Sequence, residues 1–498
     1  MDKRKNKLYY LNVKIFILLF LSYSLYKCES CPSDTPIYKN KTCQLVYCSE
    51  EEYSQNICQI RNDITRMQWL TNIILINDEK YRYCNLLINS NGDLIAEFTT
   101  EGNNGVRTFY GLKSNGNYYF KNSENKEVPT KKIIIEDKLA KYEAENIFIK
   151  LNNTKEYLLS ISLYYGYTEL YDEEFNIQSF MMTVDFNNYV IYSYKSQLIE
   201  LNTNTDEKEY LHIFEGQLKD NFYFINFYLV LNKYYFYDNI LKDTKITQIE
   251  QISNVFSARV VSSYKTDNNE IILFYYNKNY KIIVYDNDLN KNFEETISEI
   301  GNINGDTGVF LKCIYLKNNL GVFIYYKDEG DYGPHIKIEN IGNINEEYIM
   351  EEKFNISLNN IGYRFQTEPL LSDCTKINDN RFSLITSSYD KTELYVLLFD
   401  LYNNDSNLNI RIYKYLLGLY NYQIYREMTS ILYNNYLTIA LSACDSLQCD
   451  YTTEEENKNY FSLLVIFNYV NSTDSFIEIY PYLTENKIES SYSNNLIF

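Results

Sequence analysis

Five stretches of the chain share one pattern, in which a short apolar segment, a polar turn rich in Asn and Asp, and a second apolar segment follow one another. They span residues 85–99, 259–276, 311–326, 373–386 and 429–443. Alternation of apolar and polar residues is typical of a half-buried strand, and Asn or Gly in the turn supplies the positive φ that a tight hairpin needs. The pattern therefore predicts a β-hairpin in each stretch.

The hairpins recur at intervals of about fifty to sixty residues in the second half of the chain, which is typical of a β-propeller. Grouping the predicted strands gives about seven units, at 81–120, 146–186, 187–240, 255–300, 308–356, 370–418 and 425–485. We therefore predict an all-β propeller of about seven blades over residues 61–498, with six or eight blades as alternatives. The competing interpretation is two β-sandwich domains divided near 241–254, the longest polar stretch in mid-chain.

Two segments near the first blade depart from the hairpin pattern. Residues 63–76 have the apolar spacing of a strand or a short helix and contain the only tryptophan, Trp69, which we expect to be buried. Residues 137–144 have the pattern of a short helix within a polar stretch.

Residues 1–30 begin with several basic residues, continue with an apolar run over 13–25 and end in small or polar residues. This is the organisation of a secretory signal peptide, with cleavage predicted after Ser24 or Ser30. The alternative is an uncleaved signal anchor over residues 8–26, although its apolar run is short against the roughly 20 residues of a membrane span. We expect a protein that is secreted or held on the extracellular face of the plasma membrane.

The ten cysteines agree with export, because disulfides persist in oxidising compartments. We predict that residues 31–60 form a small disulfide-rich module and that Cys444 and Cys449 form a local disulfide bond. Cys313 and Cys374 occupy matching places on the first strands of two adjacent repeats, so a bond between blades is a further prediction. The disulfide candidates are Cys31, Cys43, Cys48, Cys58, Cys84, Cys313, Cys374, Cys444 and Cys449.

The formal net charge of −19 bears on partners. Binding to nucleic acid or to anionic membrane needs clustered cations, so this balance argues against both. We expect a protein or glycan ligand, and contact with a membrane only if residues 8–26 remain as an anchor.

Residues suited to catalysis are sparse. His212 and His335 are the only histidines, no GxSxG nucleophile motif is present, and His335 follows Gly and Pro in a segment predicted to be an exposed loop. A glycosidase needs only two acids at a set distance, which 66 acidic residues could supply. A secreted carbohydrate-active enzyme with a carboxylate pair is thus the alternative function, and no catalytic residue is assigned.

Asp286, Asp288 and Asn290 have the alternate-residue oxygen spacing of a calcium loop, but Lys291 follows where such loops have Gly. We interpret the triplet as a plain turn, with calcium as the alternative and no cofactor expected.

Sequons for N-glycosylation begin at Asn40, Asn152, Asn355, Asn404 and Asn471.

These observations together favour an exported, non-catalytic binding or adhesion module. Propellers commonly bind ligands through the loops at one end, so we expect the ligand there.

Overall fold

The structure is a computed structural model. It describes residues 37–39, 42–44, 71–77, 81–100, 105–135, 144–151, 155–162, 167–182, 189–191, 197–202, 207–218, 227–237, 240–252, 261–277, 279–297, 311–317, 319–325, 334–344, 347–358, 372–388, 393–404, 407–418, 423–444, 460–467 and 476–479. Two compact units are distinguished, one of residues 1–70 with 415–417 and one of residues 71–414 with 418–498.

The first unit contains one described hairpin. Strands β1 (Ile37–Lys39) and β2 (Thr42–Gln44) pair antiparallel, with Tyr38 opposite Cys43. The predicted leader and Trp69 lie outside the described residues, as does most of the module predicted at 31–60. The helix predicted at 137–144 also lies outside them except for Ala144, which begins strand β10.

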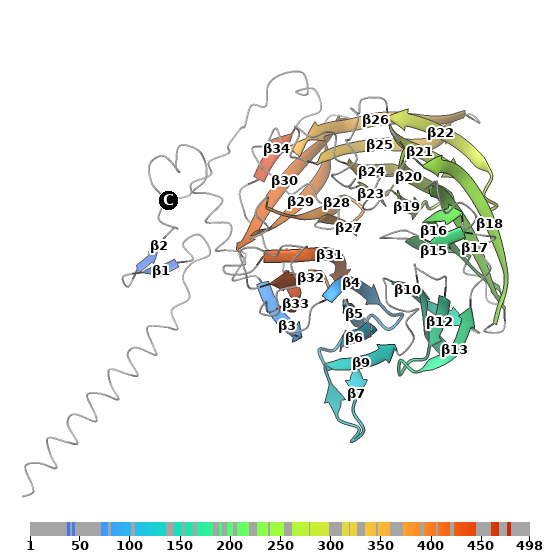
Figure 1. Ribbon diagram of the computed structural model, residues 1–498. Helices are drawn as coiled ribbons and strands as arrows, with labels where there is room; N and C mark the ends of the chain where they lie inside the picture. Colours follow the sequence, from blue (N-terminus) through green and yellow to red (C-terminus); the bar gives the residue numbers. More distant parts are fainter. Residues whose placement is uncertain are drawn as a thin grey trace, which may run out of the picture. The chain divides into compact units, whose positions relative to one another are not determined.

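The second unit consists of antiparallel sheets, which we call blades 1 to 7 in chain order (Figure 1). Blade 1 is built of β4 (Tyr81–Ile88), β5 (Leu94–Thr100), β6 (Gly105–Leu112) and β9 (Thr130–Ile135). A small hairpin of β7 (Phe120–Lys121) and β8 (Glu127–Val128) is inserted before β9. Blade 2 is built of β10 (Ala144–Leu151), β11 (Lys155–Ser162), β12 (Tyr167–Tyr171) and β13 (Ile177–Met182).

Blades 3 and 4 come next along the chain. Blade 3 is built of β14 (Tyr189–Ile191), β15 (Gln197–Asn202), β16 (Glu207–Leu218), β17 (Phe227–Tyr237) and β18 (Ile240–Ile252). In blade 3 both β14 and β15 pair with β16. Blade 4 is built of β19 (Val261–Lys265), β20 (Ile271–Asn277), β21 (Asn279–Tyr285) and β22 (Lys291–Ile297).

The last three blades complete the unit. Blade 5 is built of β23 (Leu311–Tyr315), β24 (Leu320–Tyr325), β25 (His335–Ile344) and β26 (Glu347–Ser357). Blade 6 is built of β27 (Ser372–Asn378), β28 (Arg381–Ser387), β29 (Glu393–Asn404), β30 (Asn407–Gly418) and β34 (Phe476–Ile479). Blade 7 is built of β31 (Gln423–Tyr433), β32 (Tyr436–Cys444), β33 (Tyr460–Phe467) and β3 (Thr71–Asn77).

Contacts between the innermost strands close the blades into a ring. β4, β10, β15, β19, β23, β27 and β31 each contact the next strand in this series, and β31 contacts β4 in turn. The fold is therefore an all-β propeller with seven blades in the described part of the chain, as the hairpin pattern predicts. The polar stretch at 241–254 is mostly strand β18 inside blade 3, so the two-sandwich alternative is wrong.

Blade 7 joins strands from distant parts of the chain. β3, which precedes blade 1 in sequence, pairs antiparallel with β33 and forms the outer edge of this sheet. Residues 63–76 thus contribute a strand rather than a helix over their described part. Backbone hydrogen bonds between the two ends of the propeller hold the ring closed without an exposed edge on β33.

All five predicted hairpins are the inner two strands of blades 1, 4, 5, 6 and 7. Strand β20 shows why they are so apolar. Ile271, Leu273 and Tyr275 belong to the buried cluster shared with blade 3, whereas the alternate residues Ile272 and Phe274 belong to the cluster shared with blade 5. Because a strand between two blades buries both faces, period-2 alternation is replaced by a continuous apolar run.

Several hairpin turns share one backbone geometry. In a five-residue turn the first N–H donates to the fifth carbonyl, and the fourth N–H donates to the first carbonyl. The fourth residue has positive φ, as in Gly92, Asn269 and Leu289. Asn and Gly tolerate this region at little cost, so the Asn-rich composition of the turns has a direct physical reason.

Among the described residues, no helix is long and apolar enough to cross a membrane.

Candidate functional site on the innermost strands

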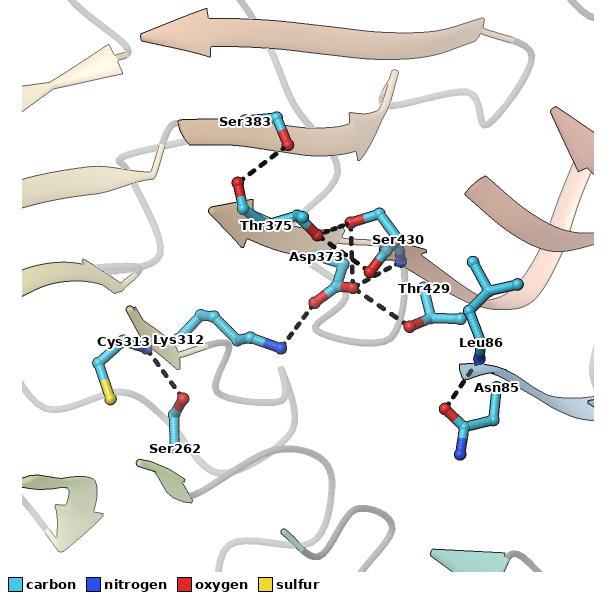
Figure 2. Close-up of polar contacts among 10 residues, drawn as sticks. All are labelled: Asn85, Leu86, Ser262, Lys312, Cys313, Asp373, Thr375, Ser383, Thr429 and Ser430. Carbon is cyan, nitrogen blue, oxygen red and sulfur yellow. Dashed lines mark hydrogen bonds and ion pairs between the residues drawn. The ribbon is translucent and has the colours of Figure 1, made fainter. Parts of the chain in front are cut away.

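A buried carboxylate on the innermost strand of blade 6 binds polar groups from both neighbouring blades (Figure 2). Asp373 is 2% exposed, and its Oδ1 lies 2.9 Å from Nζ of Lys312 on β23. Its Oδ2 accepts hydrogen bonds from the backbone N–H of Ser430 at 2.7 Å and from the hydroxyls of Ser430 and Thr429 at 3.2 Å. The Thr375 hydroxyl lies 2.6 Å from the Ser430 hydroxyl. We call these five residues the Asp373 hub.

Other innermost strands also carry polar side chains at the position that Lys312 occupies on β23. Asn85, Ser262 and Lys312 each lie four residues before the first residue of their hairpin turn. Ser262 Oγ accepts a hydrogen bond from the backbone N–H of Cys313 at 2.9 Å, which links β19 to β23. Polar bonds between innermost strands therefore connect blades 4, 5, 6 and 7 in sequence.

The contacts of Asp373 join neighbouring blades. Buried charges are costly unless they are paired and hydrogen-bonded, and Asp373 is both. Each of its oxygens already accepts at least one hydrogen bond from the protein, so the carboxylate fixes three blades against one another.

A second buried carboxylate joins blades 1 and 2. Glu97 is fully buried on β5, and its Oε1 lies 3.4 Å from Nε of Arg107 on β6. Arg107 in turn donates from Nη1 to the Ser160 hydroxyl at 2.7 Å on β11, and Asn146 on β10 donates to Glu97. This network likewise holds two blades together.

A third buried carboxylate lies in blade 5. Burial raises the pKa of Glu339 to about 7, against the opposing effect of the paired Lys337 ammonium. Glu339 is 1% exposed on β25, and Lys337 lies on the same strand and also pairs with Glu352. The raised pKa follows from desolvation of the charged form.

The proposed calcium triplet forms one of the five-residue turns. Asp286 Oδ1 accepts from the backbone N–H groups of Asp288 and Asn290, and its Oδ2 accepts from the Asn290 side-chain amide at 2.9 Å. These bonds lower the pKa of Asp286. Within the described residues no group of three or more His, Cys, Asp or Glu is arranged to hold a metal ion. The hydrogen bonds that Asp286 accepts are those of an Asx-type turn.

The disulfide predictions for Cys84, Cys313 and Cys374 are wrong, because all three keep thiols in buried positions. Cys313 and Cys374 do lie on like strands of adjacent blades, β23 and β27, as predicted. However, the Cys313 thiol interacts with Ser262 and the backbone of Phe274, both in blade 4, so it packs away from blade 6. Repeated blades point equivalent side chains in the same rotational sense, which keeps matching cysteines from facing each other.

The remaining cysteines divide into two sets. Cys444 is disulfide-bonded. Its proposed partner Cys449 lies outside the described residues, so the Cys444–Cys449 bond stays a prediction. Nothing is described of the side chains of Cys31, Cys43, Cys48 and Cys58, so their pairing stays a prediction. The thiol of Cys84 donates to the Ala440 carbonyl of blade 7 at 3.5 Å.

His335 is not in an exposed loop. It is 7% exposed at the start of β25, where it pairs with Tyr325 of β24 and its ring stacks on the tyrosine at 5.5 Å. The predicted loop included His335, whereas strand β25 already begins at this residue. Burial against a cross-strand aromatic is the physical reason for the difference.

Of the five sequons, Asn355 lies half-buried on the outer strand β26 and Asn404 ends β29. Asn40, Asn152 and Asn471 lie outside the described residues.

Lys312, Asp373 and Ser430 have no role predicted from the sequence. The signal that could have indicated one was the matching place of Lys312–Cys313 and Asp373–Cys374 in adjacent repeats.

No protein-family model matches the chain, and no curated protein matches it. Similar solved structures include a mutant NanB sialidase of Streptococcus pneumoniae, at 10% identity and a TM-score of 0.37, covering 80% of this chain and 70% of that one. An intramolecular trans-sialidase of Ruminococcus gnavus is similar at 11% identity and 0.37, covering 80% and 97%. The six-bladed fucose-recognising lectin of Aleuria aurantia is similar at 7% identity and 0.36, covering 70% and 96%.

These TM-scores are too low to support any conclusion about the fold or the function of this chain. The chain is assigned to the β-propellers by its own strand pairing and by the contacts that close its ring.

Proposed function

We propose that this protein is an exported, non-catalytic binding module that holds a protein or glycan ligand at one end of a rigid propeller. The observation that carries the proposal is the Asp373 hub. In this hub a buried carboxylate on the innermost strand of blade 6 bonds to the innermost strands of blades 5 and 7 and so joins three blades. A scaffold fixed in this way suits presentation of loops to a ligand.

Export is supported by two further observations. The first 30 residues have the organisation of a secretory signal, and Cys444 is disulfide-bonded. Structural disulfides are typical of extracellular compartments. The acidic net charge of −19 favours a ligand without clustered negative charge.

The test is to express the full chain through a secretory pathway, confirm where its mature N-terminus begins, and probe the purified protein on arrays of glycans and of extracellular proteins. Saturable binding to one class of ligand is expected. A protein that binds neither class would contradict the proposal. Turnover of aryl glycosides or oligosaccharides would favour the alternative of a carbohydrate-active enzyme.

A further inference from the structure

Two tyrosines stand out on the described surface. Tyr118 and Tyr436 are the exposed large hydrophobic side chains of the described residues, at 42% and 39% exposure. Tyr118 follows the turn after β6 in blade 1, and Tyr436 begins β32 in blade 7. These blades are neighbours in the ring, since β31 and β32 both contact β4.

Tyr436 is presented toward blade 1. It pairs directly with Tyr433 across a two-residue turn, and directly opposed residues of an antiparallel pair place their side chains on the same face. Tyr433 is 5% exposed in the cluster between blades 7 and 1, and its hydroxyl donates to the Lys113 carbonyl at 2.8 Å. Tyr436 therefore stands on the face of blade 7 that meets blade 1.

Tyr118 stands at the same junction from the other side. Its ring meets the edge of Tyr110 at 6.4 Å, and Tyr110 belongs to the same buried cluster as Tyr433. The two turns also touch, because the Asn434 side-chain amide donates to the Ser114 carbonyl at 3.3 Å. Two partly exposed aromatic rings thus flank the contact between turns 113–117 and 433–436.

Most exposed side chains of these two turns are polar and uncharged. The exposed residues of the two turns include Ser114, Asn115, Asn117, Asn434 and Asn435. Lys113 is paired with Glu127 at 3.0 Å. Asp93, which accepts from the Ser114 N–H at 3.0 Å, is buried.

We propose that this surface, the Tyr118–Tyr436 platform, binds a neutral carbohydrate. Tyrosine rings offer rigid apolar faces for the C–H face of a sugar, and Asn and Ser side chains offer donors and acceptors for its hydroxyls. Of the described charged side chains at these turns, Lys113 and Glu127 are paired and Asp93 is buried, which favours a ligand without charge. A patch formed by two turn tips is small against the roughly 1,000 Å² that a stable protein interface buries, so a glycan fits it better than a protein.

This inference rests on the proposed function and assigns its ligand class and its site. The probe is an immobilised panel of neutral oligosaccharides of glucose, galactose, mannose and N-acetylglucosamine, beside sialylated and sulfated glycans. The full mature chain is compared with Tyr118→Ala, Tyr436→Ala and Tyr436→Phe, after denaturation midpoints show that the variants are folded.

We expect the wild-type chain to bind at least one neutral glycan. Each alanine variant should bind it about three- to tenfold more weakly, as loss of one aromatic contact predicts, while Tyr436→Phe keeps the ring and stays close to wild type. Phenylalanine is the matched control, because it separates ring stacking from loss of the hydroxyl.

The outcomes distinguish the two proposals. Neutral-glycan binding that is unchanged in both alanine variants would overturn the platform and leave the binding module intact. Binding only to charged glycans, or only to a protein, would overturn the ligand class. No binding to any glycan or protein would overturn both.

Discussion

Lys312 and Asp373 lie on the first strands of blades 5 and 6, and Nζ of the lysine lies 2.9 Å from Oδ1 of the aspartate. The aspartate is 2% exposed and also binds Thr429 and Ser430 of blade 7. Asp373 therefore connects three consecutive blades through their innermost strands.

Replacing Asp373 by Asn should destabilise the propeller. Asn keeps the shape but leaves the Lys312 ammonium without its counter-charge, so we expect a loss of about 2–4 kcal/mol in the free energy of unfolding. Urea denaturation of wild type and D373N measures it.

The matched control is Asp379, which pairs with Lys376 of its own blade at 3.1 Å and with Lys317 of blade 5 at 3.5 Å. The side chains of Asp379 and Lys317 are at least half exposed, and that of Lys376 is partly exposed. Because exposed ion pairs contribute little, Asp379→Asn should leave the denaturation midpoint unchanged. Equal effects of the two substitutions would show that the hub adds nothing beyond a surface pair.

Glu339 should make stability depend on pH. Burial raises its pKa from 4.5 to about 7, so between these values the folded state binds more protons than the unfolded state. Stability must then fall as pH rises through this window, and the cost is fully present above it. Relative to Glu339→Gln, which does not titrate, the wild type should lose about 2 kcal/mol between about pH 5 and pH 7.5. The measurement is denaturant unfolding across this range. A difference between the two proteins that stays constant with pH would refute the assignment.

Cys313 and Cys374 should resist alkylation in the native protein. Both are buried, and burial raises the pKa of Cys313 to about 12 and that of Cys374 well above its ordinary value. The thiolate is the reacting species, so both should be modified by iodoacetamide only after unfolding. Peptide mass spectrometry of samples alkylated before and after denaturation, without reductant, checks this. A peptide in which Cys313 is crosslinked to Cys374 would contradict the structure.

Asn269 offers a stabilising substitution. It is exposed and has φ of 63° at the fourth position of the turn from Thr266 to Glu270. Gly adopts this conformation without steric cost whereas Asn carries a small one, so Asn269→Gly should raise the free energy of unfolding by at most about 0.5 kcal/mol.

Asn268→Gly is the control for that substitution. Asn268 lies in the same turn, is also exposed, and does not share the positive φ. Gly there only adds freedom to the unfolded chain, so a loss of roughly 0.5–1 kcal/mol is expected. If both glycines change stability in the same direction, the turn geometry is not the cause.

The repeated hairpins were predictable because their signal is local. The run from Ile271 to Tyr276 is apolar at every position since both faces of β20 are buried, and Asn269 marks the turn that precedes it. Burial and turn geometry act within a few residues, so they leave a pattern that can be read along the chain.

Other features depend on contacts between distant residues. His335 is buried by a cross-strand partner, and Cys313 packs toward blade 4 because the blades repeat with one rotational sense. Neither orientation follows from spacing along the sequence.

The sequence by itself determined the inner hairpins, the all-β class and nearly the number of blades, since these follow from hydrophobic period and turn chemistry. Only the tertiary structure decided that β3 closes blade 7, that Lys312, Asp373 and Ser430 meet, and that Tyr118 and Tyr436 flank one junction. The pairing of β3 with β33 and the Tyr118–Tyr436 junction are set by closure of the ring, which brings together residues several hundred positions apart. The contacts of Asp373 are set by the packing of consecutive blades, which brings together residues about one repeat apart.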